Sequence, residues 1–399
     1  MTLQKFVFVP EASILREGGP ICDLVEADNL DVLPQLPDSS IDCIYIDPPY
    51  NTGSSALEYS DRKTHAQWVD FVRSRLVHAA RLLKDDGAMF VSIDDREQAR
   101  LRLLCDEIFG EDNFVAQFIW HKTNRGKALS RVVRQVTEYV LCFAKNRKTL
   151  NRVGLFGSEK NLDSANPLGN RSNKRGELVF PPGQVKTNLD NGTHPAGFRG
   201  SREDTLSVEV IKPFEVQDGQ IVSELSVFGR FRWVQETLNE RIQQGTIFEI
   251  RKGKFRIVFY SDVGHKAPSS LLDSRCDVGT NESATKGIFE ILGNTDILCL
   301  YSKPVSLVRY LLNSVVRDRK DAIVLDFFAG TGTTGQAVAE LNEEDGGMRN
   351  CVLITNGEFR RYPRIAQQRL KVVFSGEAET GRKSPPGSLR VFERIPTST

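Results

Sequence analysis

The sequence of 399 residues lacks any pair of cysteines at the CxxC spacing and any apolar run that approaches the ~20 residues of a membrane span. Its seven cysteines are scattered, and most lie in apolar, strand-like segments. This pattern favours reduced core thiols over a zinc cluster or a disulfide framework. No segment resembles a signal peptide. We therefore expect a soluble, intracellular protein without a bound metal.

The chain also has little net charge. Its formal net charge is +1, and this value alone does not suggest a nucleic-acid binder. The distribution of charge does suggest one. Residues 121–176 contain thirteen Lys or Arg against three Asp or Glu, whereas residues 94–113 are acidic. A local basic excess in a nearly neutral chain favours a phosphate-binding surface over a merely solvated face.

Strand-like and helix-like segments alternate from about residue 21 to residue 146 and again from residue 286 onward. This alternation predicts an α/β fold with a doubly wound parallel sheet. Residues 147–285 interrupt it with a segment rich in Gly, Asn, Ser and Pro that contains only short β-like pieces. We therefore expect three parts: 1–146 and 286–399 as two halves of one sheet domain, and 147–285 as an inserted, partly irregular module.

The stretch IDCIYIDPPYNTG, residues 41–53, begins as a strand and ends as a turn. Its first six residues are apolar and β-branched enough for an interior strand, but Pro48 and Pro49 cannot donate to a sheet ladder. The chain must leave the sheet there. Asp47 and Tyr50 are thus expected at the carboxyl edge of the sheet, where open α/β sheets bind ligands.

A second turn, VLDFFAGTGTTG at residues 324–335, follows another apolar strand. Strand, glycine turn and helix in this order present backbone N–H groups to a ligand. Three of the glycines match the dinucleotide fingerprint GxGxxG, but the next strand ends in Thr355 and Asn356 instead of the expected acid. A P-loop is excluded, because Gln-Ala stands where Lys and Ser/Thr are required. The alternative is a tight turn that only packs a helix on a sheet.

Taken together, DPPY (47–50) and FAGTG (328–332) resemble the catalytic and S-adenosylmethionine motifs of amino-DNA methyltransferases. Their order, with DPPY about 280 residues before FAGTG, is similar to the β class of these enzymes, in which the methyltransferase sheet is circularly permuted and Rossmann-like. The likeness is greatest to the modification subunits of type III restriction systems, through stretches such as YIDPPYNTG, LLKDDGAMFVSIDD, TEYVLCFAKN, SKPVSLVRYLL and PGSLRVFERI. The chain is shorter than a typical subunit of that kind.

This resemblance implies S-adenosylmethionine as cofactor and Asp47, Pro48, Pro49 and Tyr50 as catalytic residues. The amino nitrogen of a base is a poor nucleophile because its lone pair is delocalised into the ring. If Asp47 and the Pro48 carbonyl accept its two hydrogens, the lone pair is directed at the sulfonium methyl and transfer is direct and in line. The two prolines fix the turn, and Tyr50 offers a stacking face to an extrahelical base. No metal is needed.

The resemblance also assigns the cofactor-binding residues. The glycine turn supplies Phe328, Ala329, Gly330, Thr331 and Gly332, with Asp326 upstream to receive the methionine amino group. Lys303 and Pro304 match the segment that closes over the methionine end. Asp28 follows the first strand, which we expect beside the DPPY strand, and would hold the adenine. The usual ribose acid is missing, so Asn356 or Glu358 must replace it. Asp28 could instead cap a helix, and Asp326 could simply form the turn.

DNA methyltransferases of this kind read sequence with an inserted target-recognition module, and residues 147–285 occupy that position. The basic stretch would neutralise phosphates around the flipped base, and GRFRW in the insert would reach base edges. The expected DNA-binding residues are Lys122, Arg125, Lys127, Arg131, Arg230 and Arg232. The expected partners are double-stranded DNA, a second copy of the chain as a homodimer, and a restriction subunit. The expected location is the bacterial cytoplasm, in association with the nucleoid.

We therefore predict a site-specific DNA methyltransferase that acts on adenine N6. Asp at the first position of DPPY favours adenine, because related cytosine-N4 enzymes more often carry Ser there. Cytosine-C5 chemistry is disfavoured, because none of the cysteines follows a proline. The alternatives are cytosine-N4 methylation and a catalytically idle DNA-binding relative. Glutamine methylation of a protein usually uses Asn in place of Asp47 and lacks a large insert.

Overall fold

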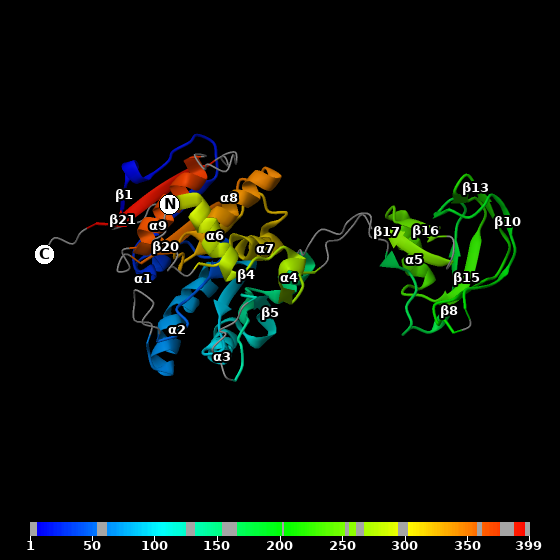
Figure 1. The fold of residues 1–399 in the computed structure, drawn as a ribbon, viewed down its shortest axis with the longest axis horizontal. Coiled ribbons are helices and arrows are strands. Elements are labelled where there is room, and N and C mark those ends of the chain that lie inside the picture. The colour runs from blue at the N-terminus through cyan, green and yellow to red at the C-terminus, as the bar shows by residue number, and fades with distance from the viewer. Residues whose placement is uncertain are drawn as a thin grey trace. The chain divides into compact units, whose positions relative to one another are not determined.

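The structure is a computed structural model that describes residues 6–53, 62–124, 132–153, 166–201, 203–251, 255–260, 267–293, 302–356, 361–375 and 387–395. The chain forms two compact units, one made of residues 1–158 and 267–399 and the other of residues 159–266 (Figure 1). The larger unit is therefore assembled from both ends of the chain. The inserted unit is narrower than the range 147–285, because α4 (Arg147–Val153) packs on β4 and α6 (Asn281–Leu292) packs on α9 of the larger unit.

The larger unit is built on a sheet of ten described strands in the order β1-β21-β2-β20-β19-β3-β4-β6-β5-β18. The strands are β1 (Phe6–Phe8), β2 (Ile21–Glu26), β3 (Ile41–Ile46), β4 (Leu83–Ile93), β5 (Phe114–His121), β6 (Thr137–Ala144), β18 (Leu271–Leu272), β19 (Ile323–Asp326), β20 (Asn350–Thr355) and β21 (Ser388–Arg394). Strands from the two ends of the chain alternate at the centre of this sheet.

The sheet is parallel at its centre and mixed at its edges. The strands β21, β2, β20, β19, β3 and β4 run parallel to one another, whereas β1, β6 and β5 each pair antiparallel with a neighbour. The expectation of an α/β doubly wound fold with a permuted strand order is confirmed. The antiparallel pairing of β6 with β4 and β5, and of β1 with β21, adds to this fold at the two sides of the sheet.

Helices cover both faces of this sheet because the buried strands alternate their side chains between two cores. In β3, Cys43 and Tyr45 pack in one core with α7 (Val305–Val316), α8 (Thr333–Asp345) and α9 (Arg361–Ser375). Ile44 and Ile46 pack in the other core with α2 (His65–Leu82) and α3 (Gln98–Phe109). Among the described residues, no helix has the length and apolar character needed to cross a membrane.

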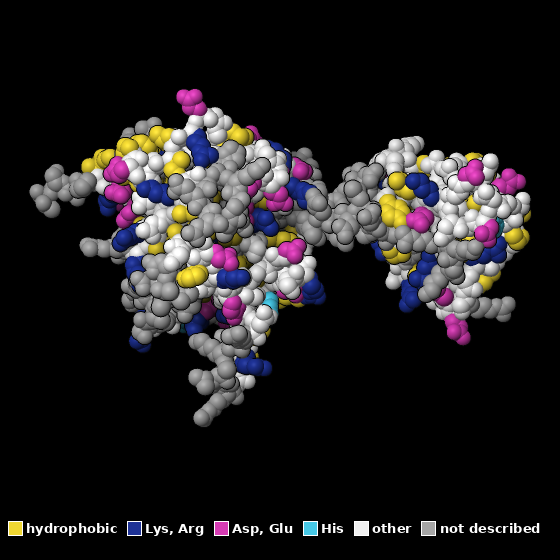
Figure 2. Space-filling model, turned by 45° about the horizontal axis from the view of Figure 1, so that its top comes forward, with side chains coloured by type: hydrophobic (Ala, Val, Ile, Leu, Met, Phe, Trp, Pro, Cys, Tyr) yellow, Lys and Arg dark blue, Asp and Glu magenta, His cyan; other side chains and the backbone are white. Residues whose placement is uncertain are grey.

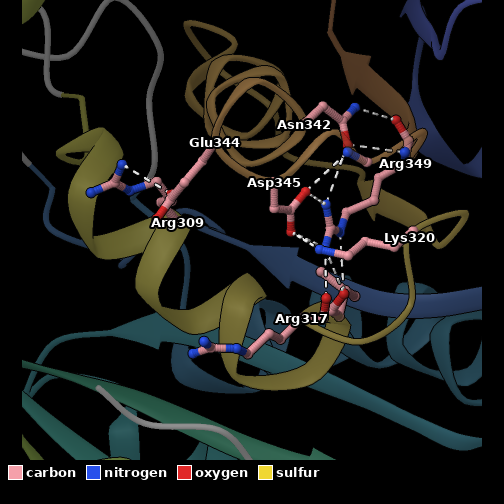
Figure 3. A network of polar contacts seen from close by, with 9 residues as sticks. Arg309, Arg317, Lys320, Asn342, Glu344, Asp345 and Arg349 are labelled. Carbon is pink, nitrogen blue, oxygen red and sulfur yellow. Dashed lines mark hydrogen bonds and ion pairs between the residues drawn. The ribbon is translucent and has the colours of Figure 1, made fainter. Parts of the chain in front are cut away.

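A buried arginine joins three elements at the amino-terminal edge of the sheet (Figure 3). The guanidinium of Arg349 donates to the carbonyls of Val316 and Arg317 at the end of α7, at 3.0 and 2.9 Å, and to Asp345 at the end of α8, at 2.8 Å. These donors satisfy carbonyls that a helix terminus leaves without partners. The contacts fix α7 and α8 to the start of β20 and leave the opposite edge open for a site.

The smaller unit has its own hydrophobic core between two antiparallel-rich sheets. One sheet has the order β10-β13-β14-β9-β16-β17-β7 and the other β11-β12-β15-β8. The elements are β7 (Asn166–Pro167), β8 (Arg175–Phe180), β9 (Val185–Thr187), β10 (Gly192–His194), β11 (Gly197–Arg199), β12 (Val208–Val210), β13 (Phe214–Gln217), β14 (Gln220–Ile221), β15 (Leu225–Arg230), α5 (Gln235–Gln243), β16 (Ile247–Arg251) and β17 (Arg256–Tyr260). Phe180 and Phe248 meet edge to face in its core, so this unit is more regular than its composition indicated.

Candidate active site

The two motif-bearing loops leave neighbouring strands at the same edge of the large sheet. β19 pairs parallel with β3, and Val324 lies opposite Cys43. DPPY follows β3 and FAGTG follows β19, so motifs separated by about 280 residues in the chain lie side by side in the fold. The central parallel pair therefore forms the position where an α/β sheet binds its ligands.

Side chains from α2 and α3 fix the DPPY turn. The indole of Trp68 donates to the Pro49 carbonyl at 2.6 Å. Asn51 has a left-handed backbone with φ of 60° and donates from its amide to the buried Glu97 at 2.7 Å. His65 contacts the same carboxylate oxygen at 2.7 Å. These contacts hold the turn in one shape, which a positioned catalytic carboxylate requires.

Lys303 and Glu138 complete a charged cluster around Asp47. The ammonium of Lys303 lies 3.2 Å from Asp47 Oδ1 and 3.1 Å from Glu138 Oε2, and it sits over the Tyr50 ring, 4.8 Å from the ring centroid. The Tyr50 hydroxyl donates to Glu138 Oε2 at 3.3 Å. Asp47 Oδ1 is buried and, among the described residues, receives no hydrogen bond, since the contact with Lys303 is an ion pair without hydrogen-bond geometry.

Glu138, in β6, was not predicted as a site residue. Burial alone would raise the pKa of its carboxyl, but the ammonium groups of Lys303 and Lys122 outweigh burial and lower that pKa. The attraction works in both directions: although burial disfavours the charged form of Lys303, the carboxylates of Asp47 and Glu138 raise its pKa. The cluster therefore brings the carboxyl groups of Asp47 and Glu138 together with the side-chain nitrogens of Lys303 and Lys122. The sequence signal was an acidic residue at the start of the otherwise apolar strand TEYVLCFA.

The carboxyl group of Asp326, at the start of the glycine turn, forms its hydrogen bonds within the turn. Asp326 Oδ1 accepts from the Phe328 amide at 3.0 Å, and Oδ2 accepts from the Thr334 hydroxyl at 2.5 Å. Burial raises the pKa of Asp326 to about 7, although both hydrogen bonds act against the increase. The turn-forming role is thus visible in these contacts. The role of Asp326 toward the methionine amino group stays a prediction.

The glycines of the turn serve different purposes. Gly330 and Gly332 both have positive φ, at 50° and 79°. A Cβ on Gly330 would have no atom nearer than 3.8 Å, whereas one on Gly332 would lie 3.4 Å from Ala366 and one on Gly335 only 2.7 Å from Leu370. The last two glycines therefore permit α8 to pack against α9, and the open space beside Gly330 fits a ligand that approaches the backbone.

Other residues of the turn are tied to a buried arginine. The Arg369 guanidinium, from α9, donates to Thr331 Oγ1 at 3.2 Å and to Thr333 Oγ1 at 2.9 Å, and Ser302 is 3.0 Å from both hydroxyls. Ala329 is buried, and its amide donates to the Ile354 carbonyl at 3.0 Å. Pro304 directly precedes α7 and is buried there. The turn and the segment that contains Lys303 thus form one connected wall.

Asp28 lies at the carboxyl edge but not beside the DPPY strand. β2 pairs with β20 and β21, so our placement of this strand next to β3 was wrong. Asp28 caps α1 (Asn29–Val32) by accepting from the Leu30 amide at 2.9 Å, and it pairs with Arg75 at 3.3 Å. Asn29 also donates to the Phe327 carbonyl at 2.8 Å. The capping alternative is confirmed, and a contact of Asp28 with adenine stays a prediction. Asn356 directly follows β20.

The expected DNA-binding residues are distributed over both units. Lys122 is 19% exposed and pairs with Glu138 at 3.1 Å, so it is committed to the charged cluster in this structure. Arg125, Lys127 and Arg131 lie outside the described residues. In the smaller unit, Arg230 stands opposite Arg175 across β15 and β8, and Arg232 follows. On the face visible in Figure 2, Lys and Arg are interspersed with Asp and Glu instead of forming one basic stripe.

Comparisons with known proteins give the family. Residues 41–354 match the model of the DNA methylase family N6_N4_Mtase. The chain is 31% identical over 350 residues to the type II methyltransferase M.KpnI of Klebsiella pneumoniae, which covers 82% of this chain and 78% of that protein. It is 28% identical to the EcoPI Mod subunit of Escherichia phage P1, covering 93% of this chain but only 65% of the subunit. The structure of PvuII DNA methyltransferase is a distant likeness, with 13% identity, coverage of 88% and 89%, and a TM-score of 0.44.

The chain belongs to the N6/N4 DNA methylase family. It is therefore an S-adenosylmethionine-dependent DNA methyltransferase, as the two motifs indicated. The matched region runs from the start of β3 to β20 and so includes both loops and the whole smaller unit.

Proposed function

We propose that this chain transfers a methyl group from S-adenosylmethionine to the N6 amino group of adenine in double-stranded DNA. The proposal depends on one observation, the environment of the Asp47 carboxylate. Its buried Oδ1 atom has no hydrogen bond from the described residues, and it lies at the end of β3, beside the glycine turn that follows β19. Among the described residues, the Lys303 ammonium at 3.2 Å compensates this buried oxygen, and an exocyclic amino group is a donor that can take its place.

The chemistry follows from this acceptor. The target amino group donates one hydrogen to Asp47 Oδ1 and the other to the Pro48 carbonyl, and its lone pair becomes available for bond formation. Tyr50 supplies the stacking face for the flipped base. When bound, the cofactor supplies an electrophilic methyl on sulfonium. The amino nitrogen would take this methyl group, and the Asp47 carboxylate would accept the proton that the methylated nitrogen loses and pass it to water.

The residues around the glycine turn fit this cofactor. The open space at Gly330 admits a ligand against the backbone, and the Phe328 ring lies 6.0 Å from the Phe71 ring at the mouth of the turn. We assign Phe328, Ala329, Gly330, Thr331 and Gly332 to the cofactor cradle. Asp28 and Asn356, at the ends of the neighbouring strands β2 and β20, are assigned to its adenosine part. Asp326, Pro304 and the backbone of Lys303, whose carbonyl accepts from Thr333 in the glycine turn, are assigned to the methionine part.

Adenine is preferred over cytosine because Asp47 stands at the first position of DPPY, where related cytosine-N4 enzymes more often carry Ser. Two of the three residues that follow β3 are prolines, so the position of Asp47 is fixed by the turn and not by the substrate. Cytosine-N4 methylation is the second candidate, since its amino group offers the same two hydrogens. The base modified by the chain decides between them.

We propose that the smaller unit, residues 159–266, recognises the target sequence. Arg230 and Arg175 are paired in register on β15 and β8; the Arg230 guanidinium donates to the Asn173 carbonyl, and the Arg175 guanidinium lies over the Phe228 ring. The pair places two cationic groups on neighbouring strands of this unit, which suits contact with DNA. Arg232 and Trp233 follow in the same GRFRW stretch. Lys122, Arg125, Lys127 and Arg131 are assigned to phosphates near the flipped base. Arg230→Gln should then lower discrimination between sites, whereas Arg125→Gln should lower the salt slope of binding by about 0.9 per contact.

A homodimer in the bacterial cytoplasm, on nucleoid DNA, completes the proposal. A restriction subunit is a further partner in the proposal, because Mod subunits such as that of EcoPI, of which this chain covers 65%, are among the relatives. Sedimentation of the purified chain with and without DNA measures the dimer directly.

The experiment is expression of the chain in a methylation-free bacterial host, followed by single-molecule sequencing of the host DNA. The expected result is N6-methyladenine at one short sequence, with no modification in cells that express Asp47→Ala. Methylation at cytosine N4 would favour the second candidate. An unmodified genome, with folded protein that binds S-adenosylhomocysteine, would contradict both.

A further inference from the structure

A lysine occupies the place that the proposed function gives to the target base. The Lys303 ammonium lies 3.2 Å from Asp47 Oδ1 and 4.8 Å from the centroid of the Tyr50 ring, and its side chain is 11% exposed. It also lies 5.5 Å from the centroid of the Trp120 ring. An amino group that donates to Asp47 Oδ1 while its ring stacks on Tyr50 must displace this ammonium. The base and Lys303 therefore compete for one position.

Two carboxylates hold Lys303, but they do so unequally. Toward Glu138 Oε2 the ammonium makes both an ion pair and a hydrogen bond at 3.1 Å. Toward Asp47 Oδ1 it makes an ion pair only, and that oxygen has no hydrogen bond from the described part of the chain. Glu138 therefore remains a hydrogen-bond partner of Lys303 when the ammonium leaves Asp47.

Glu138 is itself firmly placed. Lys122 pairs with its Oε1 atom at 3.1 Å, and the Tyr50 hydroxyl donates to its Oε2 atom at 3.3 Å. Its partner across β5 and β6 is Trp120, whose indole donates to the Gly279 carbonyl at 2.9 Å. The two ammonium groups lower the pKa of Glu138 in spite of its burial, which keeps the carboxylate charged at neutral pH. A fixed anion therefore stands next to the site where the base enters.

We propose that Lys303 is a resident cation of the base site and that Glu138 is the positioning residue that receives it when a base amino group reaches Asp47. This inference rests on the proposed function and adds a step to it. In the free protein, Lys303 neutralises Asp47 and keeps other donors away. When the base enters, Lys303 is held by Glu138, and the Asp47 carboxylate faces the amino nitrogen with its charge exposed. That charge is then available as the nitrogen becomes positive during methyl transfer.

The first variant is Glu138→Gln, which preserves the shape of the side chain and removes its charge. Lys303 should then remain on Asp47, and kcat/KM for DNA should fall roughly tenfold or more, as for closely coupled charged groups. Affinity for S-adenosylhomocysteine, measured by calorimetry, should stay within about twofold. The matched control is Asp23→Asn, which breaks the ion pair between Asp23 on β2 and Arg390 on β21 and should leave kcat/KM near the wild-type value. Equal rates for Glu138→Gln and wild type would overturn the proposal.

The second variant separates this step from a structural role of Glu138. Lys303→Met removes the cation, so Glu138→Gln should have a much smaller effect on kcat in the Lys303→Met background, at saturating cofactor. The same fold-loss in both backgrounds would mean that Glu138 acts independently of Lys303. Base flipping gives a readout that needs no turnover: with 2-aminopurine at the target position and no cofactor, Lys303→Met should increase fluorescence relative to wild type. Unchanged or lower fluorescence would refute the competition.

The outcomes also distinguish this inference from the proposed function. If the wild-type chain leaves DNA unmodified, the proposed function fails. If it methylates DNA while Glu138→Gln and Lys303→Met show no coupling, the proposed function stands and only the inference falls.

Discussion

The catalytic loop after β3 and the glycine turn after β19 leave neighbouring strands at one edge of the sheet. The carboxyl groups in the two loops differ in their hydrogen bonding. Asp326, in the glycine turn, has both oxygens bonded within the turn, to the Phe328 amide and the Thr334 hydroxyl. Asp47, in the catalytic loop, keeps a buried oxygen without a hydrogen bond among the described residues and faces a lysine instead. One carboxylate stabilises the backbone, and the other remains available to a substrate.

This difference distinguishes a carboxylate with a structural role from one with a catalytic role. A carboxylate whose bonds are all satisfied locally contributes to the shape of a turn, and its loss is felt as instability. A carboxylate with an unsatisfied, buried oxygen costs stability, and it persists where a ligand completes it. Substitutions in the two loops should therefore have different signatures.

The largest effect is expected for Asp47→Ala. Loss of the carboxylate removes the acceptor that directs the amino lone pair, so the rate of methyl transfer should fall by at least ~10³-fold, or roughly 4 kcal/mol in the barrier. The melting temperature and the affinity for S-adenosylhomocysteine should change little. Rates are measured with radiolabelled cofactor on plasmid DNA from a methylation-free host.

Asp38→Ala is the control for this substitution, because its carboxylate is 70% exposed and pairs with Arg81 away from both loops. It should leave the rate unchanged. If Asp47→Ala retained more than a few per cent of the wild-type rate, Asp47 would have no role in the chemical step.

A smaller effect is expected from the two sides of the glycine turn. Gly335→Val would place side-chain atoms 2.7 Å from Leu370 and 2.8 Å from Leu353, and it should destabilise the fold by roughly 1–3 kcal/mol or more in urea unfolding. Gly330→Ala meets no close atom, and its positive φ costs only about 1 kcal/mol. It should instead weaken S-adenosylhomocysteine binding in calorimetry. A Gly330→Ala protein with unchanged affinity would mean that the turn is only a structural connection.

The smallest effect concerns pH and Asp326. The folded pKa of about 7 lies above the unfolded value of about 3.9, so the contribution of this group is fully present below the unfolded pKa and is lost as pH rises through about 7. Between pH 6 and pH 8 the wild type should lose about 1 kcal/mol of unfolding free energy that Asp326→Asn does not lose. Urea denaturation at both pH values measures this difference. Parallel pH profiles for the two proteins would place the pKa of Asp326 elsewhere.

Much of the fold and both loops could be predicted because their signals are local. The apolar strand before DPPY and the helix VSLVRYLLNSVV are visible in the spacing of apolar residues, and the structure places them at Ile41–Ile46 and Val305–Val316. The pairing of β3 with β19 was not predicted, and the register of the two strands shows it. Turn chemistry and periodicity are short-range properties, and a sequence displays them directly.

What the sequence did not reveal depends on long-range contacts. Glu138 gains its importance from Lys303, which is 165 residues away in the chain, and from Lys122 on the adjacent strand. Helix α9 was missed, although Arg369 on it holds the glycine turn through Thr331 and Thr333. The place of β2 in the sheet was mistaken because strand order is set by tertiary pairing and not by strand sequence.

The alternation of strands from the two chain ends has a consequence for synthesis of the protein. β3 emerges from the ribosome early, but its neighbour β19 follows about 280 residues later. At translation rates of ~5–20 residues per second, one edge of the catalytic strand stays unpaired for roughly 15–60 s. A ribosome-bound fragment therefore contains the DPPY loop before the glycine turn, residues 328–332, has been synthesised. Methylation activity can appear only after the glycine turn has been synthesised, and a chain that stops before β19 presents an exposed strand edge instead of a partial enzyme.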